Sequence, residues 1–474
     1  MAYNKAKIVA TLGPASSDYE VMKKMVAAGV NVFRVNFSHS DHDNARKVVE
    51  KVRKLNEELD TNIAVLGDLQ GPKLRVGDVE EGAILSPGDI LKFTNKKMIG
   101  TAKQVYMTYK QFAADVKAGD RILIDDGKIL LEAVKTNGVD EVEAKVIQGG
   151  PLKSKKGVNL PNTRISLPCL TEKDLADLEV AMECEMEWVA LSFVRNPNDV
   201  YELRDILQKN NAPCHIISKI EKPEAVVEID EIIEASDGIM VARGDLGVEV
   251  PMQGVPLIQK MIVNKCHLAS KPVVIATQMM ETMIDNMTPT RAEVNDVANS
   301  VLDGADAVML SGETSVGNYP VQVIETMGKI IAHVEESGQV QVQEENPPRY
   351  RNKRFITDSI CYNASKVADQ VGAAAILTMS FSGYTAFKIS AHRPQTAIIM
   401  FTANRSILNT MSLLWGVRGY FYDSMESTDE TFKDIKNMVV EKGIVSEGDL
   451  VVKIASMPIY EQGMTNMLKI SSID

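Results

Sequence analysis

Cysteines are scarce in this sequence, and none is placed as a disulfide framework or a zinc site requires. The five are scattered over 474 residues without a single C-x-x-C pair: Cys169, Cys184, Cys214, Cys266 and Cys361. An odd number of isolated cysteines argues for reduced thiols. We therefore expect a cytoplasmic protein without structural disulfides.

Long apolar segments and an excess of basic residues are also missing. No apolar run reaches the roughly 18 residues that a membrane-spanning helix needs, and the N-terminal MAYNKAKIVATLG lacks the apolar core of a signal peptide. Lys and Arg number 52 against 64 Asp and Glu, for a net charge of −12. We expect no membrane span, no signal peptide and no nucleic-acid partner.

What the sequence does contain is a recurring unit of a short apolar run, a polar residue at its end and an amphipathic stretch. The eight runs are AKIVATLG, VNVFRVNFS, IAVLGDL, WVALSFV, CHIISKIE, GIMVARGD, PVVIATQ and DAVMLSG. They do not alternate strictly between apolar and polar residues, which is typical of buried parallel strands. Eight strand–helix units predict a (β/α)8 TIM barrel, whose sites lie at the C-terminal ends of the strands.

Signals for helix ends lie between the apolar runs. Ser17 with Glu20, and Thr171 with Asp174, have the spacing of capping boxes. Asn196–Pro197 suits a helix start, and Gly29 suits a helix end. These signals separate the predicted strands by helices of ordinary length.

The third unit is interrupted, and the chain is too long for one core. Short strand-like segments with Gly and Asp turns, such as RILIDDGKILLEAV, follow IAVLGDL. A Pro- and Arg-rich joint, EENPPRYRNKR, precedes a last α/β pattern. We predict a barrel formed by residues 1–70 and 168–345, an inserted small β-barrel lid domain at 71–167, and a C-terminal α/β domain at 346–474.

Polar residues at the ends of the predicted strands would converge on one mouth of the barrel. They are Arg34, Asn36, Ser38, His39, Asp68, Lys219, Glu221, Arg243, Asp245, Thr277, Ser311 and Glu313. Glu221 and Asp245 offer the hard oxygen ligands that Mg²⁺ prefers. Lys219 projects to the same side of its strand as Glu221. An ammonium beside a metal suits a transferring phosphoryl group or an enolate oxygen, and Arg34 suits a forked contact with phosphate.

Structural explanations for these residues compete with the functional ones. Any single charged residue at a strand end can be an ordinary ion pair, and Glu221 with Lys222 can be a surface pair. The SHSDHD stretch places His39 and His42 among acids, but a capped helix start accounts for the acids better than a metal site. Charged groups at most of the eight strand ends favour a site, because a purely structural barrel would need few.

Longer motifs resemble the pyruvate kinase family. They are VFRVNFSHS, GDLQGPKLR, KKGVNLP, SKIEKPEAVVEIDEIIEASDGIMVARGDLGVEVP, IATQMMETMI and PTRAEVNDVANSVLDGADAVMLSGETSVGNYP. The resemblance extends from about residue 5 into the C-terminal domain and is weakest beyond residue 345. It implies phosphoryl transfer from phosphoenolpyruvate to ADP, giving pyruvate and ATP. It also implies a lid, a C-terminal effector domain and a homotetramer.

The resemblance assigns roles to matching positions. Lys219 would face the transferred phosphoryl group, Arg34 would contact phosphate, and Thr277 would lie in the path of the proton. Glu221 and Asp245 would hold Mg²⁺ or Mn²⁺. The backbone at Ala242, Gly244 and Asp245 would bind the substrate carboxylate, and the nucleotide phosphates would meet Asn36, His39, Arg75 and Lys156. The lid would hinge at Gly71–Pro72 and near Pro168 and exclude water on closing.

One part of the match concerns a monovalent cation. Asn36, Ser38, Asp68 and the carbonyl of Leu69 match the potassium cage of many family members. Leu69, Gln70, Lys73 and Val76 instead resemble the set of the potassium-independent branch. Lys73 would then supply the charge that K⁺ otherwise brings, unless it merely faces solvent on the lid hinge. We predict that K⁺ is not required.

The segment TMSFSGYTAF in the last domain is a candidate effector loop. Ser380, Ser382, Gly383 and Thr385 offer hydroxyl and N–H groups where a strand joins a helix, although an ordinary turn would look similar. In the relatives this loop binds a phosphorylated sugar. The tail SMPIYEQGMTNML lacks an obvious basic partner for a second phosphate, which favours a monophosphate or nucleotide effector.

Two other functions fit some of the same residues. A Mg²⁺-dependent aldolase on the same barrel would also stabilise a pyruvate enolate with Glu, Asp and Arg, but would need neither the lid nor KKGVNLP. A non-catalytic sugar-phosphate sensor would leave the residues at the strand ends unexplained.

Overall fold

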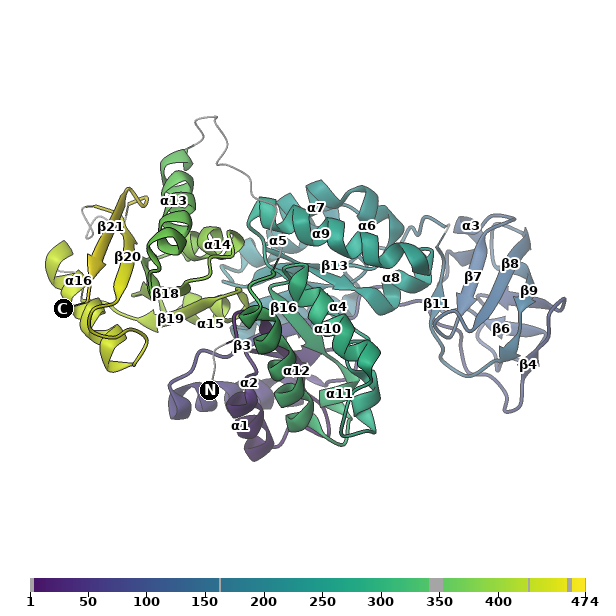
Figure 1. The fold of residues 1–474 in the computed structure, drawn as a ribbon. Coiled ribbons are helices and arrows are strands. Elements are labelled where there is room, and N and C mark those ends of the chain that lie inside the picture. The colour runs from purple at the N-terminus through teal and green to yellow at the C-terminus, as the bar shows by residue number, and fades with distance from the viewer. Residues whose placement is uncertain (1–3, 162, 341–352, 425–426, 458–462, 474) are drawn as a thin grey trace.

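The computed structural model describes residues 4–161, 163–340, 353–424, 427–457 and 463–473. A central barrel lies between an all-β domain at one end of the molecule and an α/β domain at the other (Figure 1). No helix in these ranges has both the length and the apolarity needed to cross a membrane.

The eight predicted runs form one closed parallel barrel, in the order β1-β16-β15-β14-β13-β12-β3-β2. The strands are β1 Lys7–Thr11, β2 Val32–Asn36, β3 Ala64–Asp68, β12 Trp188–Leu191, β13 His215–Ile220, β14 Gly238–Ala242, β15 Val273–Ala276 and β16 Ala307–Leu310. The predicted (β/α)8 barrel is therefore confirmed, because every strand pairs in parallel with its neighbours.

Helices connect the barrel strands and cover the outside of the sheet. They are α1 Tyr19–Ala28, α2 His42–Leu59, α4 Glu172–Glu183, α5 Pro197–Lys209, α6 Pro223–Val227, α7 Ile229–Ala235, α8 Arg243–Glu249, α9 Val255–Ala269, α10 Arg291–Leu302, α11 Gly312–Ser315 and α12 Pro320–Glu336. Short 3-10 turns, η1 Met252–Gly254 and η2 Glu281–Ile284, precede α9 and α10. Apolar helix faces and the outward faces of the strands form one buried cluster.

The predicted helix ends agree with the structure except at the start of α1. Thr171 and Asp174 form a capping box, Asn196 caps α5, and Gly29 ends α1 at φ 116°. The cap of α1 is Asp18 and not Ser17, and its carboxylate accepts from the amides of residues 20 and 21. Serine and aspartate are equally good caps, so the pattern alone could not choose between these neighbours.

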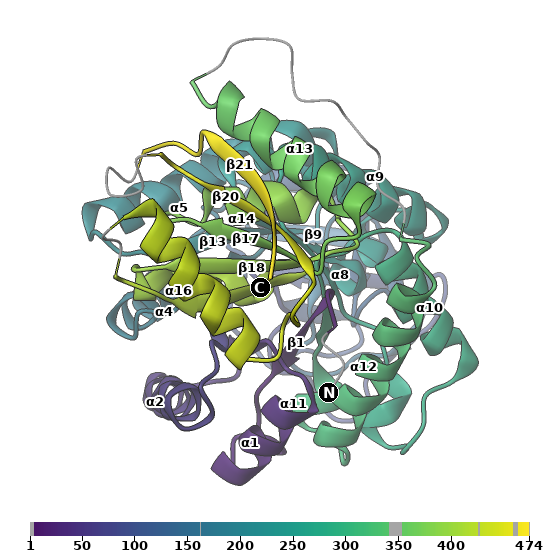
Figure 2. The same cartoon turned by 60° about the vertical axis from the view of Figure 1, so that its left-hand side comes forward.

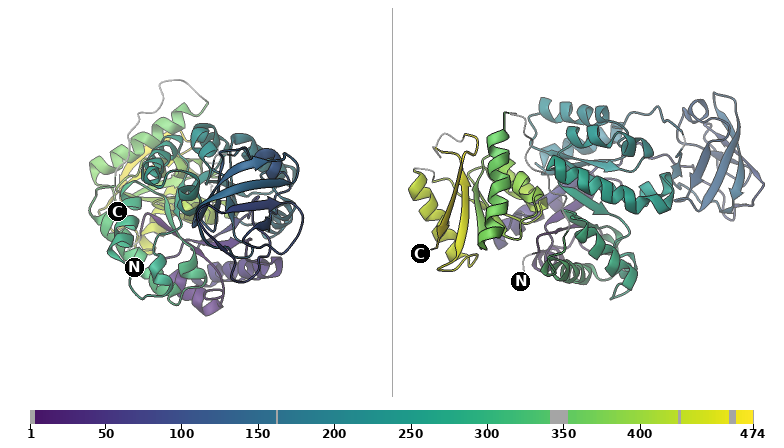
Figure 3. Two further views of the ribbon diagram at one scale, coloured as in Figure 1. Left: turned by 90° about the vertical axis from the view of Figure 1, so that its right-hand side faces the viewer. Right: turned by 45° about the horizontal axis from the view of Figure 1, so that its top comes forward.

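The domain inserted after β3 is all-β, apart from the short helix α3 Phe112–Asp115. Its six-stranded sheet has the order β11-β7-β8-β9-β5-β6, and β10 pairs with β4 beside it. The strands are β4 Ile84–Leu85, β5 Ile90–Thr94, β6 Gln104–Tyr106, β7 Arg121–Ile124, β8 Ile129–Thr136, β9 Glu141–Gln148, β10 Gly150–Pro151 and β11 Val158–Asn159. It has a buried core of its own and stands beyond the mouth of the barrel (Figure 3).

The C-terminal domain is a five-stranded sheet in the order β19-β18-β17-β20-β21, in which only β21 is antiparallel. Its strands are β17 Ala375–Met379, β18 Ala397–Thr402, β19 Val417–Phe421, β20 Leu450–Ala455 and β21 Met467–Ser472. Helices α13 Phe355–Val371 and α14 Tyr384–Ala391 pack on one face, and α16 Thr428–Glu441 packs on the other (Figure 2). The predicted joint at 344–354 lies mostly outside the described residues, so the boundary at 345/346 stays a prediction.

The C-terminal domain contacts the barrel at the end opposite the mouth. Helix α15, Arg405–Thr410, leads into a 3-10 turn, η3 Met411–Leu413, and Leu413 belongs to the buried cluster that fills the barrel interior. The Trp188 indole at the start of β12 donates to the carbonyl of Thr410 at 3.3 Å. One domain thus supplies part of the core of the other.

Candidate active site

The ends of β2, β3, β12 and β13 surround a pocket of about 180 Å³ at the mouth of the barrel. It is lined by Arg34, Asn36, Ser38, His39, Asp68, Leu69, Gln70, Lys73, Arg75, Ser192, Phe193, Lys219, Glu221 and Asp245. The geometry thus brings together most of the residues that the sequence placed at strand ends.

Lys219 is the most constrained cation of the pocket. Its Nζ donates to Ser192 Oγ at 2.7 Å and lies 3.0 Å from Glu221 Oε1 and 3.2 Å from Asp68 Oδ1. Burial alone would lower the pKa of Lys219, but the carboxylates of Asp68 and Glu221 outweigh it and raise the pKa above the usual value. The ammonium is therefore charged and fixed in direction.

Asp68 connects Lys219 to Arg34. Its Oδ2 accepts from Arg34 Nε at 2.7 Å, while Arg34 Nη1 donates to Thr11 Oγ1 at 2.9 Å. Only 1% of Asp68 is exposed, so burial opposes its charge, yet the two cations hold its pKa below the ordinary value. A single carboxylate thus orients Arg34 and Lys219, two of the cations that line the pocket.

Glu221 and Asp245 are the candidate metal ligands. Glu221 is buried, and its Oε2 accepts from the Phe193 amide at 2.7 Å. Burial, and then the charge of Asp245, raise the pKa of Glu221 against the opposing effect of Lys219. The Asp245 carboxylate lines the same pocket, and the described residues give it no hydrogen bond or ion pair. Glu221 shares its charge with Lys219 at 3.0 Å, whereas Asp245 has no such partner among the described residues. This pair of carboxylates fits a hard divalent cation.

No group of three or more His, Cys, Asp or Glu side chains in the described part of the chain gathers as a metal cage. Two protein carboxylates would leave coordination positions for substrate and water. His39 and His42 do not face one site: His39 lines the mouth, whereas His42 Nε2 lies 2.8 Å from Asp177 Oδ1 beside a separate pocket.

Thr277 lies in the adjoining wall of the mouth, in a backbone conformation that β-branched residues rarely adopt. Its φ is +68° and that of Gln278 is +57°, and such strain costs about 1–3 kcal/mol per residue. Its hydroxyl accepts from Gly244 N at 2.8 Å and donates to the carbonyl of Ala276 at 2.6 Å. The strained turn therefore aims the hydroxyl at the start of α8.

Arg243 holds that turn in place. It donates to the carbonyl of Thr277 at 2.8 Å and forms a two-point ion pair with Asp296 at 2.6 and 2.7 Å. Arg243 therefore supports the wall instead of lining the pocket. Glu313 is also structural, because it is buried and accepts from the amides of Ser311 and Met280 at 2.7 and 3.1 Å.

Other predicted residues are spread more widely. Arg75 lines the mouth, but Lys156 is absent from its lining and pairs with Asp125 of the lid at 2.8 Å. Asn36 Oδ1 accepts from Ser38 N at 3.1 Å. The effector-loop residues lie in the C-terminal domain, where Ser380, Ser382 and Thr385 line a different pocket.

Ser192 is a residue of the pocket that the sequence did not indicate. It accepts from Lys219 and donates to the carbonyl of Leu69 at 2.7 Å. The available signal was its position directly after the apolar run of β12, where other strands carry charged residues.

Comparisons with known proteins agree over nearly the whole chain. A family model described as "Pyruvate kinase, barrel domain" matches residues 3–324, and "Pyruvate kinase, alpha/beta domain" matches residues 358–471. A pyruvate kinase of Geobacillus stearothermophilus is 41% identical over 99% of this chain and 80% of that protein. One of Corynebacterium glutamicum is 40% identical over 98% and 97%. The crystal structure of a Cryptosporidium parvum pyruvate kinase matches with a TM-score of 0.92 and 32% identity, over 100% of this chain and 97% of that chain.

Replacing Asp68 by Asn tests the role of this carboxylate in stability. Asp68→Asn leaves two buried cations short of a partner, so we expect a loss of about 3–5 kcal/mol of stability. Because the folded-state pKa of Asp68 is depressed, its contribution is present above the unfolded value of about 3.9 and is lost as pH falls through the folded value.

Thermal melts between pH 2.5 and 7 provide the measurement. The variant should melt lower than the wild type at neutral pH, and the gap should narrow below about pH 4. Asp205→Asn, on the exposed side of α5, is the control. Equal melting temperatures of Asp68→Asn and the wild type at pH 7 would contradict the assignment.

Proposed function

The chain belongs to the pyruvate kinase family, and on that premise we propose that Lys219 stabilises the phosphoryl group transferred from phosphoenolpyruvate to ADP. The reaction gives pyruvate and ATP and depends on a divalent metal. An aldolase or a sensor is not favoured, because the matches extend over the barrel and the α/β domain alike. The observation that carries the proposed role is the ammonium of Lys219, which is held by three oxygens at the mouth.

Phosphoryl transfer asks the protein mainly for positioning and charge, because its transition state is loose. The Lys219 ammonium is already oriented in the free enzyme, so little reorganisation is needed as charge develops on the transferred group. Arg34 is positioned by Asp68 and Thr11 to contact phosphate. Asn36, His39, Arg75 and Lys156 complete the proposed nucleotide site. Of these, Lys156 would first have to leave Asp125.

Glu221 and Asp245 would hold the divalent ion, which we propose to be Mg²⁺ or Mn²⁺. When bound, the ion supplies positive charge that polarises substrate oxygens. Thr277 would deliver the proton to the enol carbon. The Gly244 amide donates to Thr277 Oγ1, so a substrate carboxylate bound by the backbone at Ala242, Gly244 and Asp245 would share that donor with the proton-delivering group.

We further propose that the enzyme does not require K⁺. The Leu69 carbonyl accepts from Ser192, and Asp68 Oδ1 contacts Lys219 at 3.2 Å, so two oxygens of the matched cage already have partners in the chain. The charge of Lys73 contributes, after burial, to lowering the pKa of His39. A lysine close enough to act on His39 supports its role as a tethered cation.

The C-terminal domain is the proposed effector domain. A pocket of about 450 Å³ is lined by Arg354, Thr357, Met379, Ser380, Phe381, Ser382, Tyr384, Thr385, Ser456, Gly463, Met464 and Thr465. Gly383, at φ +77°, starts α14 beside it. Arg354 is the cation in this lining, which supports a ligand with one phosphate; part of the tail, residues 458–462, lies outside the described residues.

Three further features complete the proposal. Val227, Met252 and Leu257 are 81%, 75% and 72% exposed on α6, η1 and α9, which supports burial between subunits of a homotetramer.

The free cysteines support a cytoplasmic location. We propose domain limits of 1–70, 71–167, 168–345 and 346–474, which keep each group of strands within one domain.

The test of the central role is Lys219→Met in an assay that couples ATP formation to phosphoenolpyruvate and ADP. We expect kcat to fall by about 10³-fold or more, equivalent to about 4 kcal/mol, with a modest change in KM. Near-normal kcat in a folded variant would remove Lys219 from the mechanism, and no activity in the wild type would remove the function itself.

Potassium independence is tested in buffer where tetramethylammonium replaces K⁺ at constant ionic strength. Wild-type activity should stay within a few-fold of that in KCl. Lys73→Glu should lower the potassium-free activity, and K⁺ should restore it, because a carboxylate needs a counter-cation. Activation of the wild type by roughly tenfold or more, about 1.4 kcal/mol, would contradict the proposal.

The effector proposal predicts a preference for one phosphate. Sugar monophosphates, AMP and fructose 1,6-bisphosphate are titrated separately while the dependence of rate on phosphoenolpyruvate is followed. A monophosphate or AMP should shift half-saturation at lower concentration than the bisphosphate. A preference for fructose 1,6-bisphosphate would contradict the proposal of a monophosphate or nucleotide effector.

A further inference from the structure

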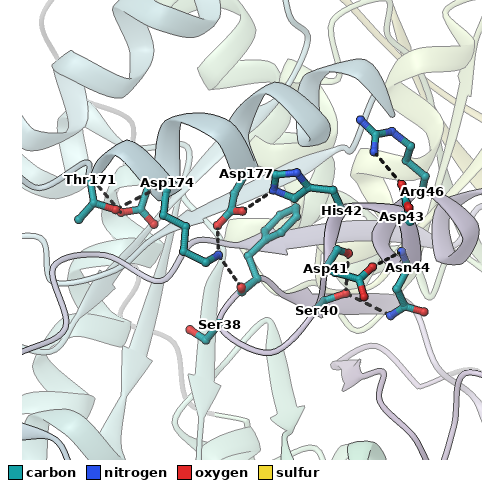
Figure 4. Close-up of polar contacts among 12 residues, drawn as sticks. Ser38, Ser40, Asp41, His42, Asp43, Asn44, Arg46, Thr171, Asp174 and Asp177 are labelled. Atoms are coloured by element: carbon teal, nitrogen blue, oxygen red, sulfur yellow. Dashed lines mark hydrogen bonds and ion pairs between the residues drawn. The ribbon is translucent and has the colours of Figure 1, made fainter. Parts of the chain in front are cut away.

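The first two turns of α4 contact both chain segments that connect the lid to the barrel. The helix begins immediately after the chain returns from the lid, with Thr171 as its cap and Asp174 as its third residue. Figure 4 shows these residues beside Asp177, His42 and the loop after β2. Segments far apart in sequence therefore meet at one helix end.

Asp174 is fully buried and divides its two oxygens between the two connections. Its Oδ2 accepts from Thr171 N and Oγ1, at 2.9 and 2.5 Å, on the return from the lid. Its Oδ1 accepts from Gly71 N at 2.9 Å, on the exit toward the lid. A capping box needs only the first contact, so the bond to Gly71, 103 positions away, is not explained by helix capping.

Gly71 itself packs against the mouth of the barrel. It has φ +67°, and a Cβ placed there would come within 2.9 Å of the Phe193 ring and 3.0 Å of Ser192 Cβ. Ser192 and Phe193 are the residues that bind Lys219 and Glu221. The Gly71 amide that Asp174 holds is therefore separated from Lys219 and Glu221 only by Ser192 and Phe193.

A second pair on the same helix reaches the loop after β2. Asp177 is fully buried and accepts from Lys173 Nζ at 2.6 Å, and Lys173 Nζ also donates to the carbonyl of Phe37 at 2.7 Å. His42 contacts the other oxygen of Asp177 (Figure 4). Phe37 stands between Asn36 and Ser38, so this pair positions the loop that carries part of the proposed nucleotide site.

We propose that the start of α4 is a clamp that sets the position of the lid hinge relative to the loop after β2, with Asp174 and Lys173 as its positioning residues. The clamp rests on the proposed function, because Arg75 beyond the hinge and His39 on the loop are assigned to the nucleotide phosphates. Its contacts fix these two groups relative to one another. The phosphoenolpyruvate site depends on the clamp less, because Lys219 also contacts Asp68 and Glu221 on the barrel strands.

Asp174→Asn is the main test. An amide has one acceptor oxygen where two backbone N–H groups need acceptors, so either Gly71 or Thr171 loses its bond. We expect KM for ADP to rise about 5–10-fold while KM for phosphoenolpyruvate stays within about twofold, because a lost hydrogen bond of this kind changes equilibria by about that factor. Hydrogen exchange at residues 69–75 should accelerate.

Two control variants separate the clamp from ordinary helix capping. Thr171→Val removes the capping hydroxyl but keeps both backbone amides of the clamp, so Tm should fall without a change in KM for ADP. Glu172→Gln removes a charge from an exposed residue of the same turn and should change neither. A Thr171→Val variant that reproduces the rise in KM would show that Asp174 is only a cap.

Lys173→Met tests the other contact of the clamp and serves if Asp174→Asn fails to fold. It should raise KM for ADP and accelerate exchange at residues 36–40 without affecting residues 69–75. If neither Asp174→Asn nor Lys173→Met changes KM for ADP or local hydrogen exchange, the proposal of a clamp is wrong. Hydrogen exchange does not depend on turnover, so it still tests the clamp if the assigned nucleotide residues prove incorrect.

Discussion

The mouth of the barrel depends on the ion pairs that the buried carboxylate of Asp68 forms with Arg34 and Lys219. Burying a lone carboxylate is costly, and Asp68 is stable as an anion because Arg34 and Lys219 both reach it. The same contacts fix the two cations in space before any substrate arrives. Lys219 in turn contacts Glu221 and Ser192, so the charge balance of one side chain extends to the candidate metal ligand and the wall.

The wall around Thr277 combines backbone strain with an ion pair outside the pocket. Thr277 and Gln278 keep left-handed backbone conformations because Arg243 ties the Thr277 carbonyl to Asp296. Substitutions at the two places would act differently. Removing a charge partner around Asp68 leaves buried ions unsatisfied. Removing Arg243 would let the turn at Thr277 relax to a less strained backbone conformation.

The sequence was sufficient for the barrel and for most of the mouth, because parallel strands in a closed barrel bring their C-terminal ends together. Arg34, Asp68, Lys219 and Glu221 followed from that rule alone. Contacts made across many residues could not be predicted in the same way. The second contact of Asp174 is with Gly71, which is 103 positions away in the other connection between lid and barrel. The ion-pair partner of Arg243 is Asp296 on α10, and no pattern near Arg243 in the sequence indicates it.

Leu413 shows how the order of the chain constrains its own assembly. The strands of the barrel are complete at residue 310, but one side chain of its interior belongs to a turn near residue 413. At about 5–20 residues per second, a ribosome needs roughly 5–20 s to make the intervening hundred residues. The lid has all its strands by residue 159, when only β1, β2 and β3 of the barrel have been made. The barrel interior stays incomplete until residue 413 is made, and transiently exposed apolar surface of this kind is what chaperones protect.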